Sequence, residues 1–288
     1  MTNATGYFDM SAAPMRIGRV MLKVRDLDRV TEFYQDVIGL AVLEREDRQA
    51  TLGAGSTPLL VLEGNPGLAP SDRHQAGLFH TAFLLPARAE LARWLRHVFE
   101  AGVPLQGASD HIVSEAIYLA DPEGNGIEVY ADRPVPAWLD TDGNIQMTTD
   151  PLDVQALLAI GEGTAWNGFP TKGSVGHVHL RVGDTDEADR FYRDVLGFDV
   201  TVDYPGASFY GSGGYHHQLA GNVWNSRGAS QRADGVSGLE AVEILVRDAA
   251  IIEAIRARAE AAGLAAATDS EDTTTLRDPW GTSIRLKT

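Results

Sequence analysis

The chain repeats itself, and the repeat limits the folds that it can adopt. The segment IGRVMLKVRDLDRVTEFYQDVIGL from Ile17 aligns without gaps with VGHVHLRVGDTDEADRFYRDVLGF from Val175. Each copy begins with alternating apolar residues, which are typical of a strand with one buried face. An amphipathic helix led by aspartate follows and closes at Gly39 or Gly197. The repeated unit therefore begins with a strand and a helix.

A second pair of segments follows the same plan. GLFHTAFLLP and GLEAVEILV read as strands, and each precedes a helical stretch that ends at a glycine. Both segments then run into an Asp-Pro-x-Gly turn, at Asp121 and at Asp278. The sequence thus predicts four modules of strand, helix and three strands, beginning near Ile17, Gly77, Val175 and Gly238.

The modules are expected to form two domains. Residues 14–133 hold modules 1 and 2, residues 172–288 hold modules 3 and 4, and residues 134–171 join them. The joining segment is polar and rich in proline, with one helical candidate from Pro151 to Ile160. One helix and four strands cannot cover their own sheet, so two modules must pair around a cavity. The predicted fold class is α+β, with curved mixed sheets.

Composition excludes several classes of function. The chain has 24 Lys and Arg residues against 40 Asp and Glu residues, and this net charge of −16 argues against nucleic acid and anionic membranes as partners. No apolar run is long enough to span a bilayer, and the N-terminal segment lacks the features of a signal peptide, so we expect a cytoplasmic protein. The chain has no cysteine, so any metal must be held by His, Asp or Glu.

The candidate metal ligands lie in modules 2 and 3. The first strands of these modules carry His80 and His177, and the last strand of module 2 carries Glu128. The aligned positions of modules 1 and 4 hold Arg19, Ala241 and Arg285. Two imidazoles and one carboxylate on one face of a metal form the facial triad of non-heme Fe(II) oxygenases. A lone histidine on a strand is more often a core residue. Here, however, all three candidate ligands are absent from the aligned positions of modules 1 and 4, and this shared absence favours a metal site.

This distribution predicts how the modules pair. Because ligands from modules 2 and 3 must meet, module 2 should pair with module 3 and module 1 with module 4. The alternative is that module 2 meets module 3 of a second chain in a homo-oligomer. In either arrangement we expect one catalytic pocket per chain, and a structural or vestigial pocket between modules 1 and 4.

The run HIVSEAIYLADPEGNGIE, from His111 to Glu128, carries a family resemblance. Together with the FYxDVxG helices and the four-module plan, it resembles the vicinal-oxygen-chelate superfamily, and within it the type I extradiol dioxygenases of the catechol 2,3-dioxygenase kind. The resemblance covers nearly the whole chain apart from the N-terminus and the joining segment. Ser109 departs from the signature, which usually has Gly, an apolar residue or an amide there. The architecture departs too, because those enzymes usually build the site from modules 3 and 4.

The resemblance implies roles for individual residues. The implied metal ligands are His80, Glu128 and His177, with Fe(II) or else Mn(II) as the metal. Tyr118 resembles the tyrosine that hydrogen-bonds the substrate, His111 the histidine that orients a substrate oxygen, and His217 the acid–base histidine. Adjacent strand residues face opposite ways, so His216 or Gln218 could face the pocket in place of His217. Weaker candidates for the substrate pocket are His179, His216, Gln218 and Tyr130.

The function implied by the resemblance is ring cleavage. An extradiol dioxygenase of aromatic hydrocarbon catabolism would bind a catechol-type diol, take O2 as co-substrate and open the ring next to the diol. Two alternatives use the same scaffold. A glyoxalase-like isomerase or lyase normally needs a second carboxylate at the metal, and a resistance-type protein that sequesters a small molecule would not need the metal residues.

Overall fold

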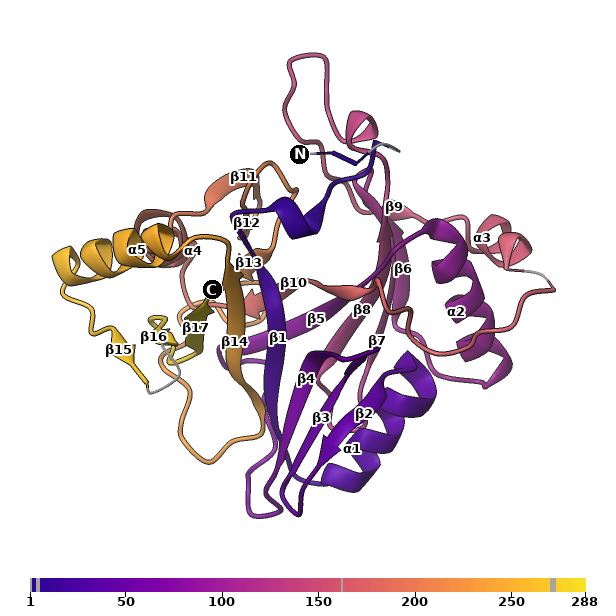
Figure 1. Cartoon of the computed structure of the whole chain (residues 1–288), viewed down its shortest axis with the longest axis horizontal. Helices are drawn as coiled ribbons and strands as arrows, with labels where there is room; N and C mark the ends of the chain where they lie inside the picture. The colour runs from indigo at the N-terminus through magenta and orange to yellow at the C-terminus, as the bar shows by residue number, and fades with distance from the viewer. Residues whose placement is uncertain (1, 4–5, 162, 270–272) are drawn as a thin grey trace.

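A computed structural model describes residues 2–3, 6–161, 163–269 and 273–288 of the chain. It confirms the four modules of strand, helix and three strands (Figure 1). Module 1 comprises β1 (Met15–Val24), α1 (Leu27–Phe33), β2 (Ala41–Arg45), β3 (Gln49–Ala54) and β4 (Thr57–Gly64). Module 2 comprises β5 (Gly77–Leu85), α2 (Arg88–Glu100), β6 (Gly107–Asp110), β7 (Ser114–Ala120) and β8 (Gly126–Asp132).

The second half of the chain repeats this order. Module 3 comprises β10 (Ser174–Arg181), α4 (Thr185–Asp189), β11 (Asp199–Tyr204), β12 (Ala207–Gly211) and β13 (Leu219–Asn222). Module 4 comprises β14 (Gly238–Val246), α5 (Ala249–Ala261), β15 (Ala267–Thr268), β16 (Thr274–Arg277) and β17 (Ser283–Lys287). The first helices of modules 1 and 3 continue into π-helical turns, η2 (Tyr34–Ile38) and η4 (Arg190–Val195).

Local sequence explains where the repeated helices begin and end. The side chain of Asp26 caps α1 by accepting a hydrogen bond from the backbone N–H of Arg29, and Asp184 caps α4 in the same way. The closing residues Gly39 and Gly197 have φ angles of 86° and 87°, in the left-handed region that favours glycine. The two helices therefore stop at equivalent positions, and each chain segment turns into its second strand.

Each sheet joins one module from each half of the sequence. The strand order of the first sheet is β15-β16-β17-β14-β1-β4-β3-β2, so module 4 pairs with module 1. The second has the order β11-β12-β13-β10-β5-β8-β7-β6-β9, so module 3 pairs with module 2 within one chain. The predicted pairing of modules is confirmed. The division of the sequence into domains at residues 14–133 and 172–288 stays a prediction, and each of these segments gives one module to each sheet.

The joining segment contributes to the second sheet. It contains η3 (Val135–Ala137), β9 (Asp150–Pro151) and α3 (Val154–Ile160), and β9 pairs with the edge strand β6. The predicted helix is present as α3, and it begins at Val154 because Asp153 accepts a hydrogen bond from the backbone N–H of Ala156. The segment leading into β9 is thereby held at the β6 edge of the second sheet (Figure 1). Among the described residues, no helix is long and apolar enough to cross a membrane.

Asp278 anchors the Asp-Pro-x-Gly turn of module 4 in the core. Its carboxylate accepts hydrogen bonds from the Tyr192 hydroxyl at 2.8 Å and from the backbone N–H groups of Trp280 and Thr282 at 3.0 and 2.7 Å. Burial raises the pKa of Asp278 from 3.8 to about 6, against the lowering effect of these hydrogen bonds. The folded state therefore holds this proton more tightly than the unfolded state.

We expect Asp278→Asn to change how stability depends on pH. The stabilising contribution of Asp278 is fully present below pH 3.8 and is lost as the pH rises through about 6. Relative to the variant, the free energy of unfolding of the wild-type protein should fall by up to about 3 kcal/mol over this range. Urea unfolding between pH 4 and pH 7 measures this difference, and parallel pH profiles of the two proteins would contradict it.

Candidate active site

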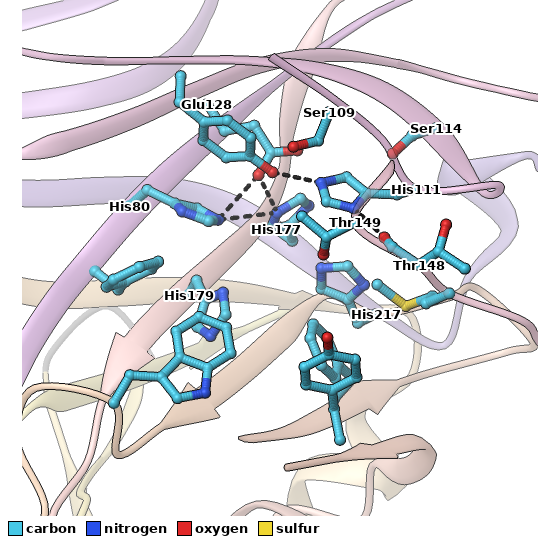
Figure 2. A pocket seen from close by; sticks show the side chains of 16 residues that line it. His80, Ser109, His111, Ser114, Glu128, Thr148, Thr149, His177, His179 and His217 are labelled. Carbon is cyan, nitrogen blue, oxygen red and sulfur yellow. Dashed lines mark hydrogen bonds and ion pairs between the residues drawn. The ribbon is translucent and has the colours of Figure 1, made fainter. Parts of the chain in front are cut away.

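The second sheet curves around a cavity of about 260 Å³. Its walls come from modules 2 and 3 and from the segment that joins the two halves of the chain. The structure brings seven of the predicted site residues to this cavity: His80, His111, Tyr118, Glu128, His177, His179 and His217. These side chains reach one space from several strands and from the loops that carry His111 and His217 (Figure 2).

His80, Glu128 and His177 meet at the buried end of the cavity. His80 Nε2 lies 3.0 Å and His177 Nε2 lies 3.3 Å from Glu128 Oε2, and the two nitrogens are 3.4 Å apart (Figure 2). The exposed fractions of the three residues are 6%, 2% and 2%. Among the described residues, these three form the one group of His, Asp or Glu that could hold a metal ion.

The central strands of the sheet explain this convergence. Strand β5 lies between β10 and β8, and Ala82 of β5 is the register partner of both His177 and Glu128. His80 is two residues before Ala82 on the same face of β5. Ala82 is fully buried, and its methyl group leaves room between the three ligand side chains. A larger residue at this position would fill the space where they meet.

The donor atoms fit a metal with octahedral coordination. Bonds of about 2.1 Å at right angles place neighbouring donor atoms about 3.0 Å apart. The observed separations of 3.0, 3.3 and 3.4 Å are close to this spacing on all three edges. The three residues could therefore occupy one face of the metal and leave the opposite face to the cavity.

Electrostatics keeps these groups in the protonation states that a metal requires. Burial raises the pKa of Glu128, but His177 and His80 outweigh this effect and hold it well below its usual range. Burial lowers the pKa of His177 to about 4, although the nearby Glu128 charge acts in the opposite direction. At neutral pH the carboxylate is ionised and the imidazole is neutral, as metal coordination needs.

Tyr118 and His111 form a hydrogen-bonded pair beside the triad. Tyr118 is the register partner of Glu128 across β7 and β8, and burial and the Glu128 charge raise the pKa of its phenol well above 10. His111 Nδ1 donates to the carbonyl oxygen of Thr148 at 2.5 Å. A neutral His111 therefore accepts, at Nε2, the hydrogen bond from the Tyr118 hydroxyl at 2.5 Å. The turn after His111 holds Ile112 at a φ of 68°, a conformation that a β-branched residue rarely adopts.

The structure distinguishes His217 from its neighbours. These residues lie just before β13 and outside any strand, and His217 lines the cavity. His216 and Gln218 do not line it, because His216 Nε2 bonds Asp132 and the Gln218 amide bonds the backbone of Ser212. Tyr130, the other weaker candidate, also stays out of the lining. Its hydroxyl bonds that of Tyr215 at 2.7 Å, and its ring packs beneath His177.

Aromatic side chains form another part of the cavity lining. Phe79, Phe209, Trp224 and Tyr204 line it, and the last two are 47% and 40% exposed at its mouth. The ring of His179 lies 5.0 Å from that of Phe79, and burial lowers the pKa of His179 well below its usual range. No lysine or arginine is among the described residues that line the cavity.

Sequence reasoning missed part of this lining. The missed residues are Ser109, Ser114, Met147, Thr148, Thr149, Tyr204 and Phe209. The residues from Met147 to Thr149 lie in the polar joining segment, which carries no periodicity that predicts an inward face. Their one sequence signal is that they come just before Pro151. Pro151 belongs to β9, which pairs with β6.

The corresponding space in the first sheet is filled by other side chains. Arg19, at the position aligned with His177, forms an ion pair with Glu243 at 2.9 Å. Arg285, at the position aligned with Glu128, contacts the sulfur of Met21 at 3.1 Å. Guanidinium groups thus stand where the second sheet has two of its metal ligands. An arginine stays protonated and has no lone pair to offer, so these groups cannot bind a cation. The candidate metal centre thus lies in the sheet of modules 2 and 3.

Comparisons with known proteins identify the family of the chain. The family model of the Glyoxalase/Bleomycin resistance protein/Dioxygenase superfamily matches residues 16–129 and 174–286. The chain is 41% identical over 268 residues to a Bacillus subtilis (strain 168) protein named catechol-2,3-dioxygenase, covering 91% of this chain and 93% of that protein. It is 29% identical over 127 residues to biphenyl-2,3-diol 1,2-dioxygenase 3 of Rhodococcus globerulus, covering 43% of this chain and 66% of that protein.

A solved structure shares the fold. Glyoxalase I from Zea mays superposes with a TM-score of 0.58 at 18% identity, covering 96% of this chain and 93% of that chain. At this identity the likeness bears on the fold, and the chemistry must be argued from the side chains in the cavity.

Proposed function

The chain belongs to the glyoxalase/bleomycin resistance protein/dioxygenase superfamily, and from this premise we propose that it is an extradiol dioxygenase that opens a catechol ring next to the diol. The observation that carries the proposal is the buried group of His80, Glu128 and His177, whose donor atoms have the spacing of an octahedral face. The 41% identity to a protein named catechol-2,3-dioxygenase supports it.

We propose Fe(II) as the metal, with Mn(II) as the alternative. Fe(II) held by these three residues would supply the Lewis acidity and the redox chemistry that a reaction of a diol with O2 needs. An imidazole binds a metal as a neutral ligand, so the three residues would contribute one negative charge, from Glu128.

The other residues of the cavity have roles in binding and proton transfer under this proposal. The ring of a catechol packs between Phe79, Phe209 and Trp224, which line the cavity. His217 accepts a phenolic proton, for which its neutral imidazole is suited. The hydrogen-bonded Tyr118 and His111 pair orients an oxygen of the substrate.

The proposed function has a direct test. The purified protein is loaded anaerobically with Fe(II), mixed with catechol and then exposed to O2. The expected result is a yellow, ring-opened semialdehyde product together with consumption of O2. If several catechols give neither product nor O2 consumption with Fe(II) or Mn(II), the proposal is wrong.

We expect the enzyme to prefer uncharged catechols. A ring carboxylate would enter a cavity that has Glu128 among its lining residues and no described lysine or arginine to pair with the added charge. The kcat/KM for 4-methylcatechol should exceed that for 3,4-dihydroxybenzoate by at least about a hundredfold. The methyl ester of the same benzoate is the matched control, and it should be cleaved because it has similar size without the charge. Equal kcat/KM values for the acid and its ester would contradict the expectation.

The isomerase alternative is less well supported by the cavity. Proton shuttling between adjacent carbons normally requires a second carboxylate at the metal, and Glu128 is the one carboxylate among the described lining residues. Analysis of the metal that copurifies with the protein separates the two functions. Iron or manganese supports the dioxygenase, whereas nickel or zinc together with isomerase activity supports the alternative.

A further inference from the structure

A chain of two hydrogen bonds, one buried and one partly buried, leads from the cavity to a carboxylate that does not line it. His217 Nδ1 lies 2.9 Å from His216 Nδ1, and His216 Nε2 lies 2.9 Å from Asp132 Oδ1. His216 is fully buried, and Asp132 is the last residue of β8, four residues after Glu128. The chain therefore connects the wall of the cavity in module 3 with the strand of module 2 that carries the metal carboxylate.

The positions of the protons along this chain follow from hydrogen-bond rules. A carboxylate accepts, so the Asp132 contact requires a proton on His216 Nε2. When His216 is neutral, its Nδ1 is then bare and must accept the hydrogen bond from His217. His217 consequently carries its proton on Nδ1, and in the neutral imidazole Nε2 is the bare nitrogen.

The surroundings hold this chain in place. The ring of Tyr215 stacks close to that of His216, with centroids 4.0 Å apart, and the indole of Trp138 packs at 5.0 Å. The Tyr215 hydroxyl donates to the same Asp132 oxygen at 3.2 Å. His216 thus has aromatic neighbours and one anionic partner, and its ring cannot turn without breaking both of its hydrogen bonds.

We infer that Asp132, acting through His216, fixes His217 as the Nδ1–H tautomer and leaves Nε2 as the proton-accepting nitrogen available to the cavity. Asp132 is a positioning residue, because it is not part of the cavity lining. The tautomer follows from the two hydrogen bonds together with a neutral His216. The use of Nε2 as the acceptor of a phenolic proton rests on the proposed function.

The tautomer can be observed without any metal or substrate. Metal-free protein containing histidine labelled with ¹⁵N in the ring is studied by long-range ¹H–¹⁵N correlation, and the His217 signals are assigned by their loss in His217→Gln. We expect a protonated Nδ1 and a bare Nε2 for His217. A protonated Nε2 in the wild-type spectrum overturns the inference, whether or not the protein cleaves catechols.

The contribution of Asp132 to turnover is tested by Asp132→Asn, which removes the charge and keeps the size of the side chain. With the Fe(II)-loaded enzyme, kcat should fall by about tenfold or more, while KM and iron content change by less than about threefold. The ¹⁵N spectrum of the variant should show a loss of the single Nδ1–H tautomer. Unchanged kcat together with an unchanged His217 spectrum overturns the role of Asp132.

A matched control separates this effect from the general loss of a buried carboxylate. Asp189, the last residue of α4 in module 3, accepts a hydrogen bond from the Tyr210 hydroxyl at 2.7 Å and does not line the cavity. Asp189→Asn should leave kcat within about twofold of the wild-type value. An equal loss of kcat in both variants would assign the effect to structure and overturn the inference. If Asp132→Asn does not fold, the wild-type spectrum still decides the tautomer.

Discussion

Glu128→Gln should remove both the metal and the activity of this protein. Glutamine has nearly the same shape as glutamate, but it lacks the negative charge. The imidazoles of His80 and His177 cannot supply this charge, because an imidazole binds a metal as a neutral ligand. Loss of an outer hydrogen-bond partner of a metal ligand costs roughly 10–100-fold, so loss of the ligand itself should lower kcat/KM by about a thousandfold or more. Iron analysis of the purified variant and the rate of catechol cleavage measure the two effects.

The internal repeat supplies the control for this substitution. Arg285 stands at the position of module 4 that aligns with Glu128, on strand β17 of the other sheet. Arg285→Gln introduces the same residue at the equivalent position of the fold, so iron content and activity should stay at their wild-type values. If Glu128→Gln retained iron and turnover, or if both variants lost them equally, the proposed metal site would be wrong.

His217→Gln should lower turnover without releasing the metal. His217 lines the cavity but lies outside the group of three converging donor atoms, and burial lowers the pKa of its imidazole well below the usual value. A neutral base in this position contributes roughly 10²–10⁴-fold to proton transfer, so we expect kcat to fall by that order while the iron content is kept. Steady-state kinetics and iron analysis of the same sample test this expectation.

The control for this variant is a histidine away from the cavity. His97 of α2 bonds the carbonyl oxygen of Asp36, is partly exposed and does not line the cavity, so His97→Gln should keep kcat and iron content close to wild type. Loss of iron from His217→Gln would identify His217 as a metal ligand and contradict the role given to it. An unchanged kcat would show that another group accepts the proton.

Much of the site could be predicted because the chain contains its own comparison. The aligned modules differ at the positions of the candidate metal ligands. His177 aligns with Arg19, and Glu128 aligns with Arg285. This difference showed which modules must meet, and the strand order confirms that modules 2 and 3 form one sheet. Successive side chains of a strand also point to opposite faces of the sheet. The residues of β5 and β8 that point into the cavity were therefore predictable.

The parts that could not be predicted lie outside regular strands. Alternation does not apply to His216 and His217, because their segment precedes β13 as an irregular loop. Thr148 lies next to His111 because β9 pairs with β6. This pairing involves two residues on each strand, which are too few to leave a pattern in the sequence. Asp132 meets His216 across the two halves of the chain, and a contact of this kind follows from the folded sheet and not from local sequence.

A crystal structure of the Fe(II)-loaded protein, with iron located by its anomalous scattering, tests the central claim most directly. The account predicts one iron ion per chain, bound by His80 Nε2, His177 Nε2 and a carboxylate oxygen of Glu128, in the sheet of modules 2 and 3. Iron bound by other residues, or iron in the sheet of modules 1 and 4, would contradict it.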